Sequence, residues 1–275
     1  MRRACLVCAG TAIEPLYGGL LRCSRCSHVF ADESLGHAEL SRLYQREYFF
    51  GDEYSNYLED RRIIEKNFAM RLATLRRYLT PAHRRLFEIG CAYGLFLNGA
   101  RGAFDAVSGI DVSEDAVRHA AGELALDVTV GDLLDADLTA RTFDVVCMWD
   151  TIEHLADPRR YVEKIAPHVP QGGLIAITTG DISSLNARVQ KERWRLIHPP
   201  THLQYFTRAS LEHMLTACGF TVVHVEYCGF YRSIAGMLHN LNLPRAGEWL
   251  RRAAPGGLDL YLNLHDIMYV IAERR

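Results

Sequence analysis

Residues 85–94 read RLFEIGCAYG, an apolar run followed by a turn that carries two glycines. An apolar run of this length is typical of a strand that is buried on both faces. Gly90 and Gly94 permit the sharp backbone turn that must follow such a strand before a helix can begin. The segment therefore predicts a first strand, a tight turn and a helix that starts near Gly94.

Segments of strand-like and helix-like sequence continue to alternate downstream of this first unit. Such alternation is typical of a mostly parallel sheet that is covered by helices on both faces. We therefore predict an α/β fold with a Rossmann-like, seven-stranded, mostly parallel sheet. The six further strands are expected at AVSGIDV (106–112), within LDVTVGDLL (126–134), and at FDVVCMWD (143–150), GGLIAITT (172–179), TVVHVEYCGF (221–230) and DIMYVIAER (266–274).

A carboxylate accompanies each of the first three predicted strands. Glu88 lies in the first strand, Asp111 ends the second and Asp132 follows the third. Sheets of this kind bind their ligands at the carboxyl ends of the strands. A carboxylate after the second strand can accept hydrogen bonds from both hydroxyls of a ribose, and Asp132 can accept one from the amino group of an adenine.

The glycine pattern of the first turn disfavours NAD as the ligand. A dinucleotide-binding turn carries glycines at 90, 92 and 95, whereas this chain has Gly90, Ala92 and Leu95. The pattern is instead E-x-G-x-A-x-G, in register with acids after the next two strands. In these residues the chain resembles the class I S-adenosylmethionine-dependent methyltransferases, over roughly residues 59–230 and the final strand.

The resemblance implies that S-adenosylmethionine is the cofactor, and it implies how the cofactor is held. The glycine-rich turn holds the methionine end, the second acid holds the ribose, and the third acid meets the adenine together with the leucine after it. Ala92 adds a methyl group where the family has glycine, so we expect a modestly altered affinity. The expected cofactor-binding residues are Glu88, Gly90, Ala92, Gly94, Asp111, Val112, Asp132, Leu133, Trp149 and Asp150.

The segment after the fourth predicted strand carries the candidate catalytic residues. Asp150, Glu153 and His154 stand at i, i+3 and i+4, so a helical turn would place them on one side. Methyl transfer needs positioning, and it needs a base when the acceptor is a hydroxyl or an acidic carbon. His154 is the predicted base because imidazole titrates near neutral pH. Glu153 is expected to orient it, and His202 to face it across the acceptor pocket.

The same residues allow a second interpretation, in which they hold a catalytic metal ion. The D-x-x-E-H group and His202 resemble the divalent-metal clusters of ubiquinone-type catechol O-methyltransferases and of small-RNA 2′-O-methyltransferases. That resemblance implies a Mg²⁺ ion held by two oxygen and two nitrogen ligands. Metal-free members of the superfamily also carry an E-H-L segment, so the base and the metal ligand remain alternative roles for His154.

Four of the eight cysteines form a pattern near the N-terminus. The pairs Cys5-x-x-Cys8 and Cys23-x-x-Cys26 suit two knuckles that bind one structural Zn²⁺ ion tetrahedrally. A reducing compartment favours metal over disulfides, and a redox role would need a thioredoxin-like βαβ context that is absent here. Because four thiolates already complete the site, His28 is expected to be an exposed neighbour rather than a ligand.

The chain divides into three predicted parts. Residues 1–30 form the zinc ribbon, residues 31–80 an aromatic linker with a helix, and residues 81–275 the cofactor domain with an insertion at about 229–265. The insertion is expected to be irregular and partly helical. It either covers the active site, mediates a dimer contact, touches a lipid-linked acceptor or packs as an ordinary helix pair.

The order of ribbon, tyrosine-rich linker and methyltransferase domain resembles the deoxysugar C-methyltransferases and the zinc-ribbon methyltransferases of glycan and natural-product pathways. In the sugar enzymes, linker tyrosines close over the cofactor and the acceptor. The resemblance implies Tyr48, Tyr54 and Tyr57 as an acceptor lid, and a sugar, glycan precursor or natural-product intermediate as the acceptor. A basic and aromatic patch of Trp194 and its charged neighbours at 191–195 is a candidate for binding a phosphate of that acceptor.

The composition limits the classes of partner. The 275 residues carry a formal net charge of −2, so the chain does not coat nucleic acid through net charge. It has no run of 18 apolar residues and no signal-peptide core. We expect a cytoplasmic monomer or homodimer with a small-molecule acceptor and no nucleic-acid partner. The alternative is a nucleic-acid or protein methyltransferase whose ribbon recognises the substrate, although the ribbon has only a mild basic excess.

Overall fold

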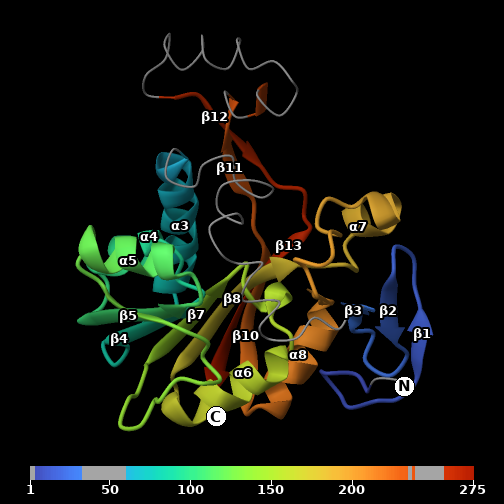
Figure 1. The fold of residues 1–275 in the computed structure, drawn as a ribbon, viewed down its shortest axis with the longest axis horizontal. Coiled ribbons are helices and arrows are strands. Elements are labelled where there is room, and N and C mark those ends of the chain that lie inside the picture. The colour runs from blue at the N-terminus through green and yellow to red at the C-terminus, as the bar shows by residue number, and fades with distance from the viewer. Residues whose placement is uncertain (1–3, 33–59, 235–236, 239–256) are drawn as a thin grey trace.

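The computed structural model describes residues 4–32, 60–234, 237–238 and 257–275. Its largest element is a seven-stranded sheet with the order β10-β13-β8-β7-β4-β5-β6 (Figure 1). The strands run parallel except for β13, which is antiparallel to both of its neighbours. The predicted α/β, Rossmann-like sheet is therefore confirmed. Its strands are β4 (Arg85–Ile89), β5 (Ala106–Asp111), β6 (Asp127–Val130), β7 (Val145–Trp149), β8 (Leu174–Gly180), β10 (Phe220–Tyr227) and β13 (Ile267–Arg274).

The chain changes direction across the sheet at β4. From β4 it moves outward through β5 to β6, and it then returns to the other side of β4 as β7. In open α/β sheets, ligands bind at the carboxyl ends of the strands beside such a switch point. The turns that follow β4, β5 and β7 are therefore the place to look for a binding site.

Helices cover both faces of the sheet (Figure 1). Buried side chains of α3, α4 and α5 pack on one face, and those of α6 and α8 pack on the other. The side chains of Ser113, Asp157 and Thr207 cap the starts of α5, α6 and α8 by accepting backbone hydrogen bonds. The helices are α3 (Arg61–Arg76), α4 (Leu95–Ala100), α5 (Glu114–Gly122), α6 (Pro158–Ile165), α7 (Leu185–Gln190) and α8 (Arg208–Ala217).

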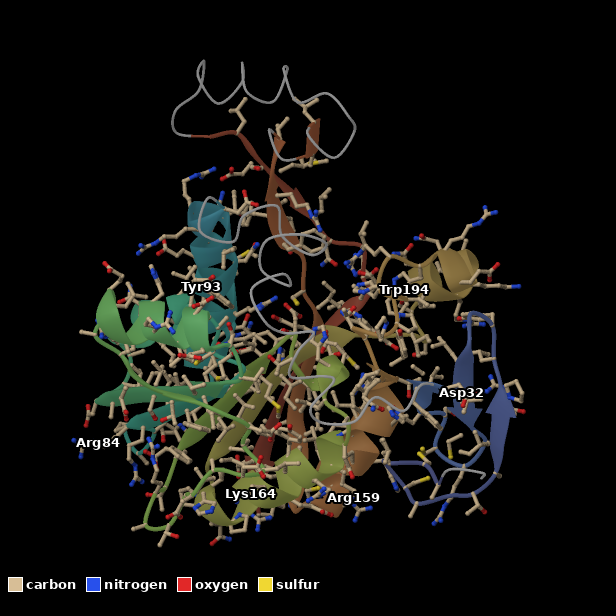
Figure 2. The ribbon with its side chains drawn as sticks, in the orientation of Figure 1. Asp32, Arg84, Tyr93, Arg159, Lys164 and Trp194 are labelled. Atoms are coloured by element: carbon tan, nitrogen blue, oxygen red, sulfur yellow. The ribbon has the colours of Figure 1, made fainter. Side chains whose placement is uncertain are left out.

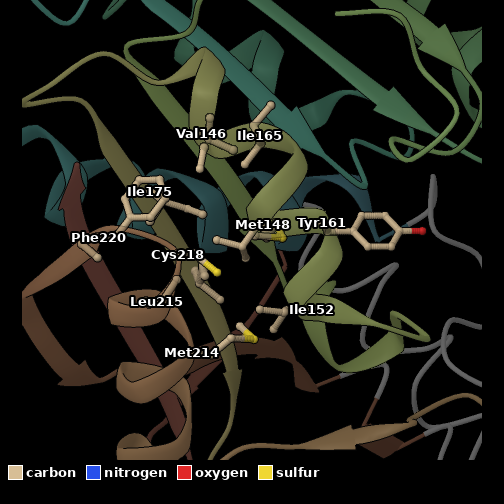
Figure 3. Packing of buried hydrophobic residues seen from close by; sticks show 14 of the residues in the cluster. Val146, Met148, Ile152, Tyr161, Ile165, Ile175, Met214, Leu215, Cys218 and Phe220 are labelled. Atoms are coloured by element: carbon tan, nitrogen blue, oxygen red, sulfur yellow. The ribbon is translucent and has the colours of Figure 1, made fainter. Parts of the chain in front are cut away.

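Strand β7 contributes to the core on both faces of the sheet, because successive side chains of a strand point in opposite directions. Cys147 and Trp149 belong to the cluster beside α3 and α4. Val146 and Met148 belong to the other cluster, where they meet side chains of α6 and α8 (Figure 3). This double burial explains why the strand reads as an unbroken apolar run.

A second, smaller sheet joins the N-terminal segment to the main domain. Strands β1 (Ile13–Pro15), β2 (Leu20–Cys23) and β3 (Val29–Ala31) pair antiparallel in sequence order. The fourth strand, β9 (Gln204–Tyr205), comes from the main domain and pairs antiparallel with β3. The N-terminal strands thus share a hydrogen-bonded sheet with the segment that precedes α8.

His28 is buried, so the expectation of an exposed neighbour is wrong. Its side chain has no exposed surface, and its ring lies 4.8 Å from the ring of Phe206, measured between centroids. The Nε2 atom lies 2.9 Å from Oε1 of Gln204. The histidine is covered because β9 pairs with β3, and no local feature of the sequence indicates that pairing.

The described ends of the insertion form a two-stranded sheet, which the sequence did not predict. Strands β11 (Phe230–Ser233) and β12 (Asp259–Leu262) pair antiparallel and stand above α3 in Figure 1. Asp259 accepts hydrogen bonds from Arg62 and Lys66 of α3. The insertion is therefore attached to the helix that precedes the main sheet.

Two further expectations concern the acceptor lid and membrane-spanning helices. Tyr48, Tyr54 and Tyr57, the expected acceptor lid, lie outside the described residues. Among the helices of the described residues, none has both the length and the apolar character needed to cross a bilayer.

Candidate active site

The turn between β4 and α4 has a backbone that only small residues can adopt. Gly90 and Gly94 have φ angles of +77° and +72°, in the left-handed region. A Cβ on Gly90 would lie 2.6 Å from the side chain of Thr151, and one on Gly94 would lie 2.4 Å from Leu126. Ala92 also has a positive φ, of +43°, although it is not glycine. The turn is therefore narrow, and Ala92 holds a conformation that costs an L-residue energy.

Replacement of Gly90 by alanine is expected to lower the free energy of unfolding by about 2–4 kcal/mol, from backbone strain and from overpacking against Thr151. Gly99→Ala is the matched control, because Gly99 lies in α4 and a Cβ there meets no described atom within 4 Å. The control should be neutral or up to about 1 kcal/mol more stable. Urea titration measures both values, and equal effects at the two positions would contradict this account of the turn.

Asp111 holds the glycine turn in place. Its carboxylate accepts hydrogen bonds from the backbone N–H of Ala92 and of Ser113, both at 2.8 Å. Burial raises the pKa of Asp111, while these N–H donors act in the opposite direction. The carboxylate therefore links the end of β5, where half-buried Val112 follows, to the turn after β4.

Glu88 is a buried carboxylate without a complete set of partners. Its side chain is 2% exposed, and Oε2 has no hydrogen-bond partner among the described residues. Burial raises its pKa well above the ordinary value, and the nearby charge of Asp111 adds to that effect. A buried acceptor of this kind favours a hydrogen-bond donor or a cation as the ligand.

The end of β6 presents a second pair of expected contacts. One oxygen of Asp132 accepts the backbone N–H of Leu134, and the other accepts the hydroxyl of Tyr161. Figure 3 shows that hydroxyl pointing away from the buried cluster. Leu133 is 1% exposed and belongs to the core.

Arg71 of α3 is a site residue that the sequence interpretation missed. Its guanidinium forms an ion pair with Asp150, and Asp150 also accepts a hydrogen bond from the Thr178 hydroxyl at 2.9 Å. Trp149 is buried between the rings of Phe96 and Tyr269, at centroid distances of 5.0 and 5.3 Å. The sequence interpretation placed a helix within residues 31–80 but assigned no function to its charged side chains.

Glu153, His154 and His202 come together beside the glycine turn. Each offers a ligand atom, and the three atoms lie within 4.8 Å of one another. The first two belong to a short 3₁₀ turn at Ile152–His154, and the rings of the two histidines lie 4.6 Å apart. Asp150 lies outside this group, because its φ of +49° turns the chain before the 3₁₀ turn begins.

Hydrogen bonds fix the orientation of these three side chains. The Nδ1 atoms of His154 and His202 donate to the carbonyls of Thr201 and Leu196, both at 2.8 Å. The proton is therefore on Nδ1 in each ring, and Nε2 carries the lone pair. The carboxylate of Glu153 accepts the hydroxyl of Thr179 at 2.9 Å. A small cavity of about 10 Å³, room for one water-sized occupant, is lined by Glu153 and His202 among others.

Burial shifts the pKa values of all three side chains toward their uncharged forms. It lowers the pKa of His154 to about 4 and that of His202 to about 2. Burial, together with the charge of Asp150, raises the pKa of Glu153 to about 8. The sequence interpretation assumed an ordinary imidazole pKa for His154 and did not anticipate this burial. At neutral pH both imidazoles are therefore uncharged.

The four N-terminal cysteines also converge. Sγ of Cys5 lies 3.5 Å from that of Cys26, and Sγ of Cys8 lies 3.6 Å from that of Cys23. Four thiolates at about 2.3 Å from one Zn²⁺ ion would be separated by roughly 3.8 Å, close to these distances. The cluster is therefore consistent with a zinc ribbon.

The predicted basic and aromatic patch lies only partly at the surface: Lys191 and Arg193 are exposed, but Trp194 is not. Trp194 is 1% exposed, and its Nε1 donates to Asp266 at 2.9 Å. Arg195 pairs with the same carboxylate. Figure 2 shows Trp194 between α7 and the ends of the main sheet, where it fills the interior. The buried Asp266 attracts both side chains, and the sequence gave no sign of that contact.

Comparison with known proteins agrees with the fold and with the turn after β4. Residues 57–225 match the family described as a methyltransferase domain. A ubiquinone biosynthesis O-methyltransferase from Alkalilimnicola ehrlichii is 34% identical over 104 residues, which are 35% of this chain and 41% of the relative. One from Coxiella burnetii is 25% identical over 117 residues, which are 40% of this chain and 49% of the relative. The chain thus spans less than half the length of these relatives.

A solved structure shows the same fold. Magnesium protoporphyrin IX methyltransferase from Synechocystis, with bound SAH, aligns with a TM-score of 0.53 and 15% identity, covering 83% of this chain and 92% of that one. The family match covers more than half of the 275 residues, including the glycine turn and the acids that follow it. The chain therefore belongs to the class I S-adenosylmethionine-dependent methyltransferases and carries an N-terminal four-cysteine cluster.

Proposed function

We propose that the chain transfers the methyl group of S-adenosylmethionine to a hydroxyl or an acidic carbon of a small-molecule acceptor, such as a sugar, a glycan precursor or a natural-product intermediate. The observation that carries this proposal is the contact between two turns. A Cβ on Gly90 would lie 2.6 Å from Thr151, the residue before the 3₁₀ turn with Glu153 and His154. A cofactor whose methionine end lies at the first turn would therefore face the second.

The charges of the first turn fit a cationic cofactor. S-adenosylmethionine would supply a sulfonium methyl group, which the acceptor attacks in line with the C–S bond, so that the thioether departs as a neutral leaving group. Glu88 has a buried oxygen that lacks a partner among the described residues, and an ammonium group would satisfy it. Asp111 stands at the end of β5, where it can accept from ribose hydroxyls. The cofactor also carries a carboxylate. Arg71 lies near enough for its positive charge to act on Glu88, and it would attract that carboxylate.

Glu153, His154 and His202 would act on the acceptor. In the first of two roles, Nε2 of His154 takes the proton of the acceptor while the Thr201 carbonyl holds the ring through Nδ1–H. In the second role, the three side chains hold a divalent metal ion, which would lower the pKa of an acceptor hydroxyl. The contacts favour the second role. Imidazoles held through Nδ1–H by carbonyl groups are typical of metal ligands, and a pKa of about 4 makes His154 a weak base.

Two imidazoles and one carboxylate suit Mn²⁺ or Zn²⁺ better than the Mg²⁺ expected from the sequence, because Mg²⁺ prefers oxygen ligands. The cavity lined by Glu153 and His202 has room for one small occupant. Calorimetric titration with each ion separates these choices.

A small molecule fits the site better than a macromolecule does. In the alternative function, the ribbon would recognise nucleic acid or protein. The inner strand of the ribbon is covered by β9, and the exposed Arg22 is paired with Glu14 at 2.6 Å. Of the described basic side chains of the ribbon, only Arg25 is exposed without an ion pair, which is little positive surface for contacts with phosphates.

Asp111→Ala is expected to weaken cofactor binding by roughly 10- to 150-fold, because two charge-assisted hydrogen bonds to the ribose are lost and the turn at Ala92 is released. Calorimetry with S-adenosylmethionine or its demethylated product measures the change. Asp115→Ala is the control, because Asp115 is exposed on α5 and pairs only locally with Arg118. Absence of binding by the wild-type chain would overturn the proposed function.

A further inference from the structure

A single segment of the main domain connects the ribbon to the candidate catalytic turn. The backbone N–H of Leu203 donates to the carbonyl of Glu153 at 2.9 Å. The carbonyl of Leu203 accepts a hydrogen bond from the backbone N–H of Ala31, at the end of β3, at 2.9 Å. In Figure 1, β3 is the ribbon strand nearest the main sheet. Leu203 thus bridges the two parts through its own backbone.

The side chain of Gln204 makes the same bridge. Its Oε1 atom accepts a hydrogen bond from Nε2 of His28 at 2.9 Å. Its Nε2 atom donates to the carbonyls of Leu155 and Ala156, at 3.1 and 3.4 Å, which directly follow His154. Gln204 is 3% exposed and His28 is fully buried, so water cannot replace either partner. Only one orientation of the Gln204 amide accepts the hydrogen bond from His28 and also donates to the two carbonyls.

We propose that His28 and Gln204 are positioning residues through which the zinc ribbon holds the His154 turn in its working geometry. The ribbon fixes His28, His28 orients the amide of Gln204, and the amide fixes the two carbonyls after His154. The neighbouring Thr201 carbonyl orients the imidazole itself, at 2.8 Å. A shift of segment 201–206 would therefore reach the histidine ring directly. This inference rests on the role given to His154 in the proposed function.

The inference explains why the methyltransferase domain and the ribbon share a hydrogen-bonded sheet. Among the described residues, no hydrogen bond joins the glycine turn after β4 to the ribbon, so cofactor binding would not depend on the ribbon. The turn with Glu153 and His154 has contacts on both sides, with Thr179 of β8 and with Leu203 beside β9. The ribbon would thus act on the acceptor side of the reaction.

Gln204→Leu tests the link, because leucine has similar volume and removes both halves of the bridge. Amide exchange of residues 151–157 should rise roughly 5- to 100-fold, and the ring ¹⁵N signals of His154 should shift. Cofactor affinity should stay within about threefold of wild type, and one zinc ion per chain should remain. Arg22→Ala is the control, because Arg22 lies on the ribbon surface and bonds only to Glu14 among the described residues.

Gln204→Glu is the second variant. A carboxylate keeps the acceptor for His28 and loses the donor for Leu155 and Ala156, so this variant should loosen the turn while exchange of residues 28–31 stays unchanged. Unchanged exchange and an unchanged His154 signal in both variants would overturn the inference. A uniform rise in amide exchange that includes β4 and β5 would also overturn the inference, because Gln204 would then be an ordinary core residue. These readouts need neither cofactor nor acceptor, so a failure of the proposed function would be recognised separately, by calorimetry.

Discussion

His154→Ala should lower turnover roughly 10²- to 10⁴-fold and change cofactor affinity by less than about twofold. The imidazole lies in the turn that faces the methyl-bearing end of the proposed cofactor site, whereas Glu88 and Asp111, the residues proposed to bind the cofactor, belong to β4 and β5. His213→Ala is the matched control, because His213 is exposed on α8. Turnover is measured with methyl-labelled cofactor on an acceptor found by its mass shift. Wild-type turnover in both His154→Ala and His202→Ala would place the chemistry elsewhere.

The same variant separates the two roles of the imidazole. If the cluster holds a metal ion, Mn²⁺ titration followed by electron paramagnetic resonance should find one site in the wild type. That site should weaken at least tenfold in His154→Ala and in His202→Ala, and a chelator weak enough to leave the four-cysteine zinc in place should stop turnover. If His154 is only a base, turnover should resist the chelator and fall below about pH 5, since burial lowers its pKa to about 4. Chelator resistance together with no Mn²⁺ site would exclude the metal.

Loss of zinc should unfold the N-terminal strands. Structural zinc sites contribute about 10–16 kcal/mol of apparent binding energy, and strands of three or four residues cannot replace that energy by burial. Cys8→Ser should therefore remove the zinc ion and abolish exchange protection of residues 13–31. Cys218→Ser is the matched control, because both thiols are 8% exposed and Cys218 lies at the end of α8.

Cofactor affinity should survive the loss of zinc. The turn after β4 is held by Asp111 and by its contacts with Thr151 and Leu126, all within the main domain. Metal analysis should find about one zinc per wild-type chain and per Cys218→Ser chain, and calorimetry should find cofactor binding in all three proteins. Retention of ordered β1–β3 after complete zinc removal would show that packing against β9 alone holds the ribbon.

The sequence predicted what depends on local pattern. The apolar run 143–150 forms β7 because both of its faces are buried. Gly90 and Gly94 have the positive φ angles that the turn requires. Each of these features follows from residues within a few positions of one another, so one sequence is enough to find them.

The remainder of the site depends on contacts between distant segments. Nothing near His28 indicates that β9 covers it, and nothing near Arg71 indicates its ion pair with Asp150. The low pKa of His154 arises from its burial, and the carbonyl that orients its ring belongs to Thr201, 47 positions away. The sequence identifies the chemical type of each side chain, but the folded structure determines which groups it contacts and how exposed it is to solvent.

The pairing of β3 with β9 has a consequence for synthesis on the ribosome. His28 and Gln204 are separated by 176 residues. At 5–20 residues per second, the N-terminal strands wait on the order of 10–40 s for their partner to emerge. The cysteine knuckles can bind zinc during that time, but Val29 and Phe30 stay uncovered along an open strand edge, which invites pairing between nascent chains. Zinc supply and chaperone capacity should therefore limit the yield of folded chain more than the stability of the finished domain does.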